Sequence, residues 1–306
     1  MRNPTTIDTV LLVEVKGATK KDKIVFFCIK NIYRGLTVLS RIVVGKKKGD
    51  QPYNQRRISF MGFLYKSIEF LGLDDSFSLV FDVPEYDYKF YSLVTKKIPN
   101  FSIQDMYASM TIHEKDVRKH FNPKEGDVVI DVGAAFGLYT LPSSKQVGQS
   151  GKVIAIEAHP KNYEMLNRNV KLNNLTNVTC LNYAVYSTKT KVKIYSNYTI
   201  MSERVSGKGK EKAKEVNADT LDNILEQSGI AAEQVNWIKI DVEGAELEVL
   251  KGAHNILSNS KDIAISIEIH GQNKYQPVID VLNSYNLRVI VQKNYDWGDS
   301  HVIARQ

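Results

Sequence analysis

The chain has 306 residues, 43% of them hydrophobic, which is enough for one large α/β domain with an additional segment. No stretch has the apolar length of a membrane span, and the first fourteen residues lack the apolar core of a cleavable signal peptide. The net charge of +7 comes from residues 1–60, which hold 13 basic and 4 acidic residues against 28 and 30 in the remainder. This distribution weakens any argument from charge to nucleic-acid binding by the rest of the chain.

The first 103 residues predict an N-terminal α+β extension. Residues 25–43 carry apolar side chains at helical spacing between groups of lysines, and two interpretations stay open. One is a basic amphipathic helix that contacts a membrane peripherally through residues 16–48; the other, which we favour, is a helix or strand pair packed on the main domain. Residues 77–95 predict a β-hairpin that turns near residues 84–87. A helix is predicted over residues 104–120.

Residues 104–306 predict the main domain, because strand and helix patterns alternate there as in βαβ units. We expect an α/β fold with a doubly wound, seven-stranded, mostly parallel sheet. Its strands are predicted at residues 128–132, 152–157, 178–185, 237–241, 263–269, 288–292 and 301–304. Helices are predicted from residue 137, at 160–172, from a cap at Asp219 to residue 227, and at 245–257 and 275–285. A strand at 192–195 is expected to pair antiparallel, and the lysine-rich residues 205–215 predict a solvated loop.

The two cysteines, Cys28 and Cys180, lie inside apolar runs without the spacing of a disulfide framework or a metal site. We expect both to be small buried hydrophobic residues. Together with the missing signal peptide, this pattern predicts a cytoplasmic protein.

A glycine-containing loop follows the first strand of the main domain, with Asp131 at the strand end and Gly133 and Gly137 four residues apart. Glycine allows a tight turn and a close approach between backbone and ligand. The Gly-x-x-x-Gly spacing differs from the Gly-x-Gly-x-x-Gly fingerprint that brings a helix N-terminus onto a pyrophosphate. The loop therefore favours a nucleoside ligand without phosphates, such as S-adenosylmethionine, over a nicotinamide dinucleotide.

Other polar residues end later strands: Glu157 after the second, Asp241 and Glu243 after the fourth, Glu268 and His270 after the fifth. Ligands of open α/β sheets bind at the carboxyl ends of the strands, so these side chains are expected to line one pocket. Glu157 lies where a carboxylate can accept both ribose hydroxyls.

Several polar residues at and near the strand ends also have a structural interpretation. Asp131 can cap the loop amides, although a carboxylate at the end of an apolar strand is costly without partners. A lone histidine such as His270 is often a satisfied structural residue. Glu246 and Glu248 are expected to be solvated residues favoured by the helix dipole.

Three sequence blocks resemble the FkbM family of S-adenosylmethionine-dependent methyltransferases: residues 129–134, 169–173 and 238–253. The last block, Ile-Lys-Ile-Asp-Val-Glu-Gly-Ala-Glu with Val-Leu-Lys-Gly-Ala, is the specific one. The resemblance spans about residues 104–305 and implies a class I, Rossmann-like domain that methylates sugar or polyketide hydroxyls. The cofactor-binding set that it implies comprises Asp131, Gly133, Ala134, Ala135, Gly137, Glu157, Ala158, Ala184 and Asp241. One departure from the pattern is Pro142, early in the helix after the glycine loop; a proline there can shorten or kink the helix, although it is tolerated in a first turn.

The predicted catalytic residues are Asp241, His270 and Glu268. A hydroxyl acceptor must lose its proton during methylation, and we hypothesise that His270 or Asp241 receives it. A divalent metal held by Asp241, Glu268 and His270 is a second route, which we do not favour because no local ligand spacing supports it.

The expected acceptor is a small molecule or a glycan. Two alternatives remain: an RNA or protein methyltransferase, suggested by the basic N-terminal segment, and a non-catalytic scaffold that binds the cofactor. The absence of an Asp/Asn-Pro-Pro-Tyr/Phe tetrapeptide and of a recognisable RNA-binding module argues against nucleic acid.

Overall fold

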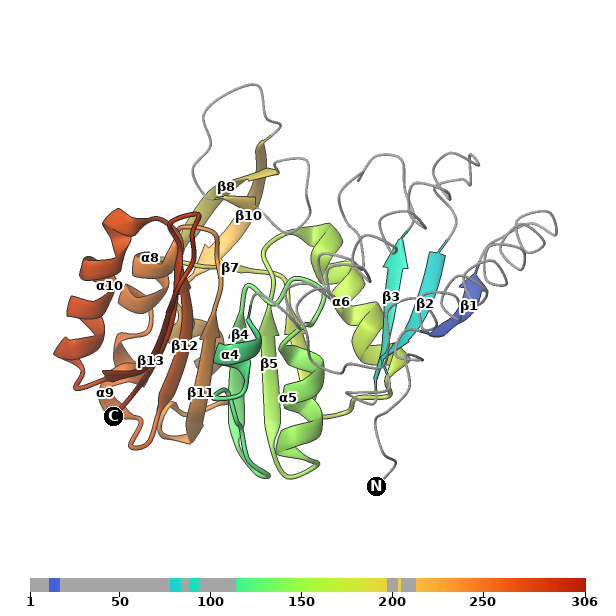
Figure 1. Ribbon diagram of the computed structural model, residues 1–306, viewed down its shortest axis with the longest axis horizontal. Coiled ribbons are helices and arrows are strands. Elements are labelled where there is room, and N and C mark those ends of the chain that lie inside the picture. Colours follow the sequence, from blue (N-terminus) through green and yellow to red (C-terminus); the bar gives the residue numbers. More distant parts are fainter. Residues whose placement is uncertain (1–10, 17–77, 84–87, 94–113, 197–202, 205–212) are drawn as a thin grey trace, which may run out of the picture. The chain divides into compact units, whose positions relative to one another are not determined.

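The computed structural model describes residues 11–16, 78–83, 88–93, 114–196, 203–204 and 213–306 (Figure 1). The chain divides into two compact units, Met1–His113 and Glu114–Gln306. The predicted helix at 25–43, the turn at 84–87, Cys28 and most of the predicted membrane-contacting segment lie outside the described residues. Within the described ranges, no helix is both long and apolar enough to cross a membrane.

The first unit contains an antiparallel sheet of three described strands, ordered β1-β2-β3. They are β1 (Leu11–Lys16), β2 (Ser78–Val83) and β3 (Tyr88–Leu93). The β2–β3 pair runs in register from Ser78 opposite Leu93 to Val83 opposite Tyr88, which confirms the predicted hairpin. β1 was not predicted. In β3, the buried rings of Tyr88 and Phe90 pack edge to face with centroids 5.0 Å apart.

The second unit is built on a seven-stranded sheet in the order β13-β14-β12-β11-β4-β5-β6, which confirms the predicted fold class. Strands β12, β11, β4, β5 and β6 run parallel, and β14 lies antiparallel between β12 and β13. The bounds are β4 (Val128–Val132), β5 (Lys152–Ile156), β6 (Val178–Leu181), β11 (Val235–Ile240), β12 (Ala264–Ile269), β13 (Arg288–Asn294) and β14 (Ser300–Arg305).

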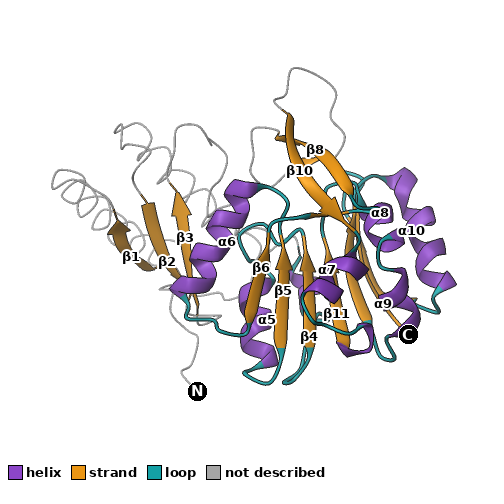
Figure 2. Cartoon of the chain, turned by 180° about the vertical axis from the view of Figure 1, so that it is seen from behind, coloured by secondary structure: helices purple, strands orange, loops and turns teal. Residues whose placement is uncertain are grey.

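Helices cover both faces of this sheet. Figure 1 shows α4 and α5 in front of it, and Figure 2, from behind, shows α7 over the opposite face. The helices are α4 (Lys115–Arg118), α5 (Thr140–Val147), α6 (Pro160–Leu172), α7 (Leu221–Gln227), α8 (Glu246–Lys251), α9 (His254–Asn259) and α10 (Gln272–Ser284), with a 3₁₀ turn at Ala232–Gln234.

A large apolar core fills the face covered by α7–α10. Alternate residues of each strand point into it, such as Ile130 of β4, Ile238 of β11 and Ile267 of β12, where they meet Leu225 of α7 and Leu282 of α10. Strands buried on both faces read as nearly continuous apolar runs, which is why the sequence located them well. Each fully buried isoleucine or leucine contributes about 1.5–3 kcal/mol to folding.

A second, four-stranded sheet lies beyond the carboxyl ends of the parallel strands, where both figures place β8 and β10. Its order is β7-β10-β8-β9, with β7 (Ala184–Val185), β8 (Thr190–Ser196), β9 (Glu203–Arg204) and β10 (Ala213–Asp219). The predicted antiparallel pairing of β8 is confirmed, with β10 as its partner. Two predictions are wrong here: residues 178–185 form two strands in different sheets, and residues 213–215 belong to a strand instead of a loop.

Several predicted helix boundaries shift for local reasons. The helix expected at 245–257 is split into α8 and α9 at Gly252, where a Cβ would lie 2.2 Å from the Tyr186 carbonyl oxygen. The cap of α7 is Thr220, whose Oγ1 accepts from Asn223 N; Asp219 was predicted instead. Because α5 begins only at Thr140, Pro142 occupies its first turn, where no intrahelical N–H bond is lost.

Two further details of the predicted elements differ. Helix α10 begins at Gln272, three residues before the predicted start. Of the helix expected over residues 104–120, the described part is the single turn of α4. Cys180 in β6 is only partly buried, and it packs beside Ala155 and Leu166.

Candidate active site

The carboxyl edge of the sheet brings the loops after β4, β5, β11 and β12 together, because these strands are parallel and neighbouring. The loops after β4 and β11 touch. Asp241 N donates to Val132 O at 3.0 Å, and a Cβ on Gly133 would lie 1.8 Å from the Asp241 carbonyl oxygen. Gly133 also has a φ of 79°, so this position requires glycine on two grounds.

The amides of the glycine loop are bonded within the protein. Gly133 N and Ala134 N both donate to Ile156 O, at 2.9 and 3.1 Å, and Gly137 N donates to Ala134 O at 2.8 Å. Ala135, with a φ of 48°, donates its N–H to Glu157 Oε2 at 2.7 Å. A phosphate needs such amides free, whereas the hydroxyls and amino group of S-adenosylmethionine need acceptors. The hydrogen bonds of these four amides therefore disfavour a phosphate ligand at this loop.

Glu157 is a buried carboxylate that joins two loops. Its Oε1 accepts from His159 N at 2.8 Å, while its Oε2 accepts from Ala135 N. Burial raises the pKa of Glu157 to about 7, although both backbone bonds act in the opposite direction. Each carboxylate oxygen retains a second lone pair for a hydroxyl, so ribose binding by Glu157 stays a prediction. Asn182, which the sequence did not single out, holds the same loop by donating to Glu157 O and Ala158 O at 2.8 and 3.0 Å.

Asp131 has a partner inside the protein. Its buried Oδ2 accepts from Thr140 Oγ1 at 2.6 Å, which ties the end of β4 to the first turn of α5. Burial raises the pKa of Asp131, partly offset by the Thr140 hydrogen bond and the charge of Lys239. Cofactor contact by Asp131 stays a prediction. The hydrogen bond from Thr140 gives Asp131 a structural role, which differs from the predicted capping of the loop amides.

Three alanines of the predicted cofactor set pack in two small apolar clusters. Ala134 is buried against Ala155 and Leu166. Ala158 packs beside Ala184, which belongs to β7 of the second sheet. Their cofactor contacts stay a prediction as well.

Lys239 has one of the largest fully buried side chains, and its ammonium pairs with the carboxylate of Asp241. Its Nζ lies 3.3 Å from Asp241 Oδ2 and 4.7 Å from the centroid of the Tyr139 ring. Burial alone would lower the pKa of Lys239, but the carboxylates of Asp241, Glu114, Glu268 and Asp131 outweigh it and raise the pKa. A buried ammonium is tolerated only with such partners, so Lys239 and Asp241 form one unit.

Glu268 lies deeper than the sequence suggested, on the same face of the sheet as Lys239. Burial raises its pKa to about 8, with further upward contributions from Asp241 and Glu114. Its cross-strand neighbour is His301, whose Nε2 lies 2.9 Å from Ser266 Oγ. Burial lowers the pKa of His301 to about 3, so this histidine is neutral. The sequence gave no reason to single out His301, because it lies in the ordinary, mostly apolar pattern of a buried strand.

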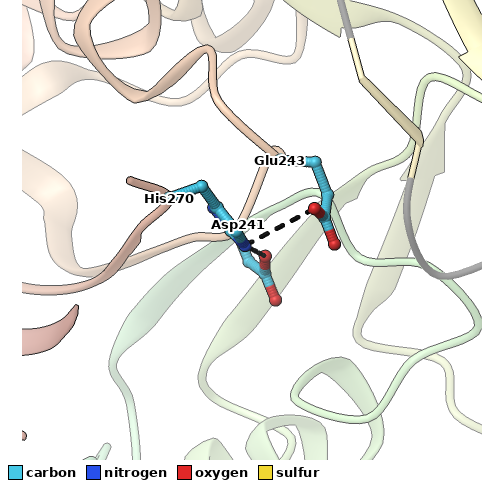
Figure 3. Close-up of side chains that lie close together, drawn as sticks. All are labelled: Asp241, Glu243 and His270. Atoms are coloured by element: carbon cyan, nitrogen blue, oxygen red, sulfur yellow. Dashed lines mark ion pairs between the residues drawn. The ribbon is translucent and has the colours of Figure 1, made fainter. Parts of the chain in front are cut away.

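The side chains that converge at the edge are Asp241, Glu243 and His270 (Figure 3). His270 Nε2 lies 3.8 Å from Asp241 Oδ1 and 3.6 Å from Glu243 Oε2, while Nδ1 bonds Glu246 Oε1 at 2.8 Å. Burial lowers the pKa of His270, but Glu246, Asp241 and Glu243 outweigh this effect and raise it to about 10. Glu268, expected beside His270, is not one of the three residues of this cluster, although its charge also contributes to the raised pKa of His270.

The turn after β11 places Glu243 in the cluster. Glu243 has a φ of 51° and Gly244 a φ of 113°, so the chain reverses tightly there. Lys274 Nζ holds the turn by donating to Gly244 O at 2.7 Å. Glu246, which the sequence predicted to be solvated, is instead completely buried: its Oε1 accepts from Gly244 N at 2.7 Å as well as from His270. Glu248 is partly exposed and pairs with Lys251 at 2.7 Å.

Comparison with known proteins identifies the class of this site. The model of the methyltransferase FkbM domain matches residues 131–290, which is more than half of the chain and includes all the predicted site residues. The chain belongs to the FkbM methyltransferase family. This FkbM-family protein is an S-adenosylmethionine-dependent methyltransferase, as the sequence predicted.

Two curated methyltransferases are similar to this FkbM-family chain. Hexuronic acid methyltransferase AglP of Haloferax volcanii is 30% identical over 189 residues, covering 60% of this chain and 72% of AglP. Methyltransferase sdnD of Sordaria araneosa is 28% identical over 198 residues, covering 55% of this chain and 74% of sdnD. Among solved structures, methyltransferase FkbM from Methylobacillus flagellatus aligns with a TM-score of 0.43 and 16% identity, covering 66% of this chain and 54% of that one.

Proposed function

We propose that this methyltransferase transfers the methyl group of S-adenosylmethionine to a hydroxyl of a sugar or another small-molecule acceptor. The supporting observation is the position of Asp241. Its backbone packs against Gly133 in the glycine loop, while its carboxylate, 32% exposed, points to the acidic cluster at the edge. One residue thus joins the expected cofactor wall to the expected acceptor side. The name of AglP, a hexuronic acid methyltransferase, supports a sugar as the acceptor class.

The reaction asks the protein for alignment and proton removal. S-adenosylmethionine, when bound, supplies a methyl group already activated on a sulfonium. The acceptor oxygen forms a new bond to this methyl as the bond from methyl to sulfur breaks, and the hydroxyl proton passes to the cluster. Holding the reacting atoms in line contributes most of the rate enhancement, and a positioned base adds about 10²–10⁴-fold.

Asp241 is better placed than His270 to receive this proton. Lys239 holds Asp241 Oδ2, which leaves Oδ1 directed toward the cluster. His270 donates Nδ1–H to Glu246, and its Nε2 faces two carboxylates. The side chain of His270 is also the less exposed, at 15% against 32% for Asp241. We therefore assign proton removal to Asp241 and the orientation of the acceptor to His270.

The test is transfer of a labelled methyl group from S-adenosylmethionine to a panel of hexuronic acids, glycans and small alcohols, with the product identified by mass spectrometry. We expect a methyl ether on a hydroxyl, and a loss of at least about 100-fold in kcat for Asp241→Asn. Binding of S-adenosylmethionine by that variant, measured by calorimetry, separates a lost base from a lost cofactor site. Labelled RNA or protein from a cell extract, with no labelled small molecule or glycan, would overturn the proposal.

A further inference from the structure

We propose that Asp241, Glu243 and His270 bind a divalent transition-metal ion of the Mn²⁺ type at the edge of the sheet. The use of this ion in methyl transfer rests on the proposed function, but its binding does not. The cluster differs from the metal set that the sequence suggested, because Glu243 takes the place of Glu268.

The three candidate ligand atoms lie close together. Each residue offers one atom, and all three atoms lie within 4.8 Å of one another. The distances from His270 Nε2 to the two carboxylates, 3.6 and 3.8 Å, exceed a hydrogen bond. A six-coordinate ion with bonds of about 2.1 Å places adjacent ligands about 3.0 Å apart, so an ion would draw these atoms together by about 0.6–0.8 Å.

Glu246 gives His270 the orientation of a metal ligand. Its Oε1 accepts from both His270 Nδ1 and Gly244 N, at 2.8 and 2.7 Å, and the side chain is completely buried. A carboxylate can only accept here, so Nδ1 carries a proton, and Nε2, the other ring nitrogen, faces Asp241 and Glu243. Buried carboxylates hold metal-binding histidines in this way in many sites.

Within the described part of the chain, two lysines near the cluster pair with other atoms. Lys239 Nζ pairs with Asp241 Oδ2, on the side of the carboxylate away from the cluster, so Oδ1 is directed to the ion position. Lys274 Nζ donates to Gly244 O and lies 3.9 Å from Glu246 Oε2. Both lysines thus pair behind the ligands, and the two carboxylates facing His270 provide negative charge for a cation.

The donor set selects the type of ion. Two carboxylates suit Mg²⁺, Ca²⁺ and Mn²⁺, while an imidazole favours first-row transition metals, and Mn²⁺ satisfies both preferences. Three protein ligands leave positions for water or an acceptor hydroxyl. A hydroxyl oxygen on the ion would lose its proton more readily, and the proton would pass to water. With the ion bound, Asp241 would serve as a ligand, and its assignment as the base applies to the site without the ion.

The experiment is a titration of the full-length protein with MnCl₂, followed by electron paramagnetic resonance of free Mn²⁺, in the absence of cofactor and acceptor. We expect one ion per chain, and at least about tenfold weaker binding in His270→Ala and in Glu243→Gln. Asp262→Asn is the matched control, because it removes an exposed carboxylate that pairs with Arg305 at 3.2 Å, at the opposite end of β12. Glu246→Ala is expected to weaken binding as well, since His270 loses its orienting partner.

Equal Mn²⁺ affinity in the wild type, His270→Ala and Glu243→Gln would overturn the metal site, as would the absence of stoichiometric binding by the wild type. Thermal unfolding of each variant excludes a folding defect as the cause of lost binding, and Glu243→Gln, on a partly exposed turn, is the variant expected to stay folded. Because the titration requires no turnover, a missing methyl transfer would contradict the proposed function without affecting the binding result.

Discussion

The two faces of the seven-stranded sheet differ in what they bury. On the face under α7–α10, the strands contribute isoleucines and valines to one apolar core. On the face under α4 and α5, the same strands contribute Asp131, Lys239 and Glu268. The first face needs only the burial of apolar surface, which is tolerant of exchanges of similar volume. The second face depends on buried charges of opposite sign that compensate one another. Among them is Asp241, which lies in the candidate site.

The polar face also carries an aromatic support. Tyr139 donates its hydroxyl to Glu114, its ring stacks under Arg118 at 4.0 Å, and it packs edge to face with Phe121 at 5.1 Å. Burial raises the pKa of Tyr139, and the Glu114 carboxylate adds to this shift, so the phenol stays neutral. The apolar face thus stabilises the fold, whereas the polar face stabilises the fold and sets the charge of the site.

The largest effect is expected from Lys239→Met, which tests whether the polar face depends on charge compensation. The substitution removes the buried ammonium and leaves its carboxylate partners uncompensated. We expect the free energy of unfolding to fall by about 3–5 kcal/mol, measured by urea denaturation. The methyl transfer rate should fall as well, because Asp241 loses its partner. If stability is unchanged, the polar face does not depend on charge compensation.

On the apolar face, Ile267→Ala should lower the free energy of unfolding by about 2–5 kcal/mol through lost burial and a cavity. Under conditions where the variant is folded, its methyl transfer rate and cofactor affinity should match the wild type. Comparing the two variants at equal fractions of folded protein separates a loss of fold from a loss of site. A catalytic defect in folded Ile267→Ala would show that the two faces are coupled.

A smaller effect is expected from Thr140→Val, which keeps the shape of the side chain and removes the hydroxyl that donates to Asp131. Loss of a hydrogen bond to a charged group should reduce the free energy of unfolding by about 1.5–3 kcal/mol. Thr220→Val provides a contrast, because it removes the cap of α7 and should cost about 1 kcal/mol. Equal losses in both variants would argue against a special role for the buried carboxylate.

The remaining effect is the contribution of His301 to the pH dependence of the free energy of unfolding. The pKa of His301 is about 3 in the folded protein and about 6.5 in the unfolded chain, so the unfolded chain binds the extra proton as the pH falls below 6.5. His301 therefore lowers stability progressively between pH 6.5 and 3, by about 2 kcal/mol at pH 5. Well above pH 6.5 the histidine is neutral in both the folded and the unfolded chain, so it no longer makes the free energy of unfolding depend on pH.

Other groups titrate over the same range, so the measurement is a difference between the wild type and His301→Asn. The pKa of His159 is lowered to about 4, which gives the same sign, while the raised pKa values of Glu157 and Glu268 give the opposite sign. Urea denaturation at pH 7 and pH 5 should show the wild type losing about 2 kcal/mol more than His301→Asn. Parallel pH profiles for the two proteins would contradict the assignment.

Most of the second unit was predictable because its signals are local. Buried parallel strands such as β4 and β12 are continuous apolar runs, and the acids that follow them mark the carboxyl edge. The errors occur where distant contacts decide. The proximity of Gly252 to the Tyr186 carbonyl splits one predicted helix, and the pairing of residues 213–215 with β8 converts a lysine-rich segment into a strand.

For this protein, the sequence alone determined the family, the sheet and the edge at which the functional residues gather, because strand periodicity and the Asp241–Gly252 block are properties of neighbouring residues. Only the tertiary structure decided which acids face one another there. It places Glu243 toward His270, buries Glu246 against the Nδ1 side of the imidazole ring, and leaves Glu268 near Lys239 on the polar face of the sheet. These roles depend on a reversal after β11 and on contacts with the loop after β12. Side chains brought together from separate strands carry no spacing signal along the chain.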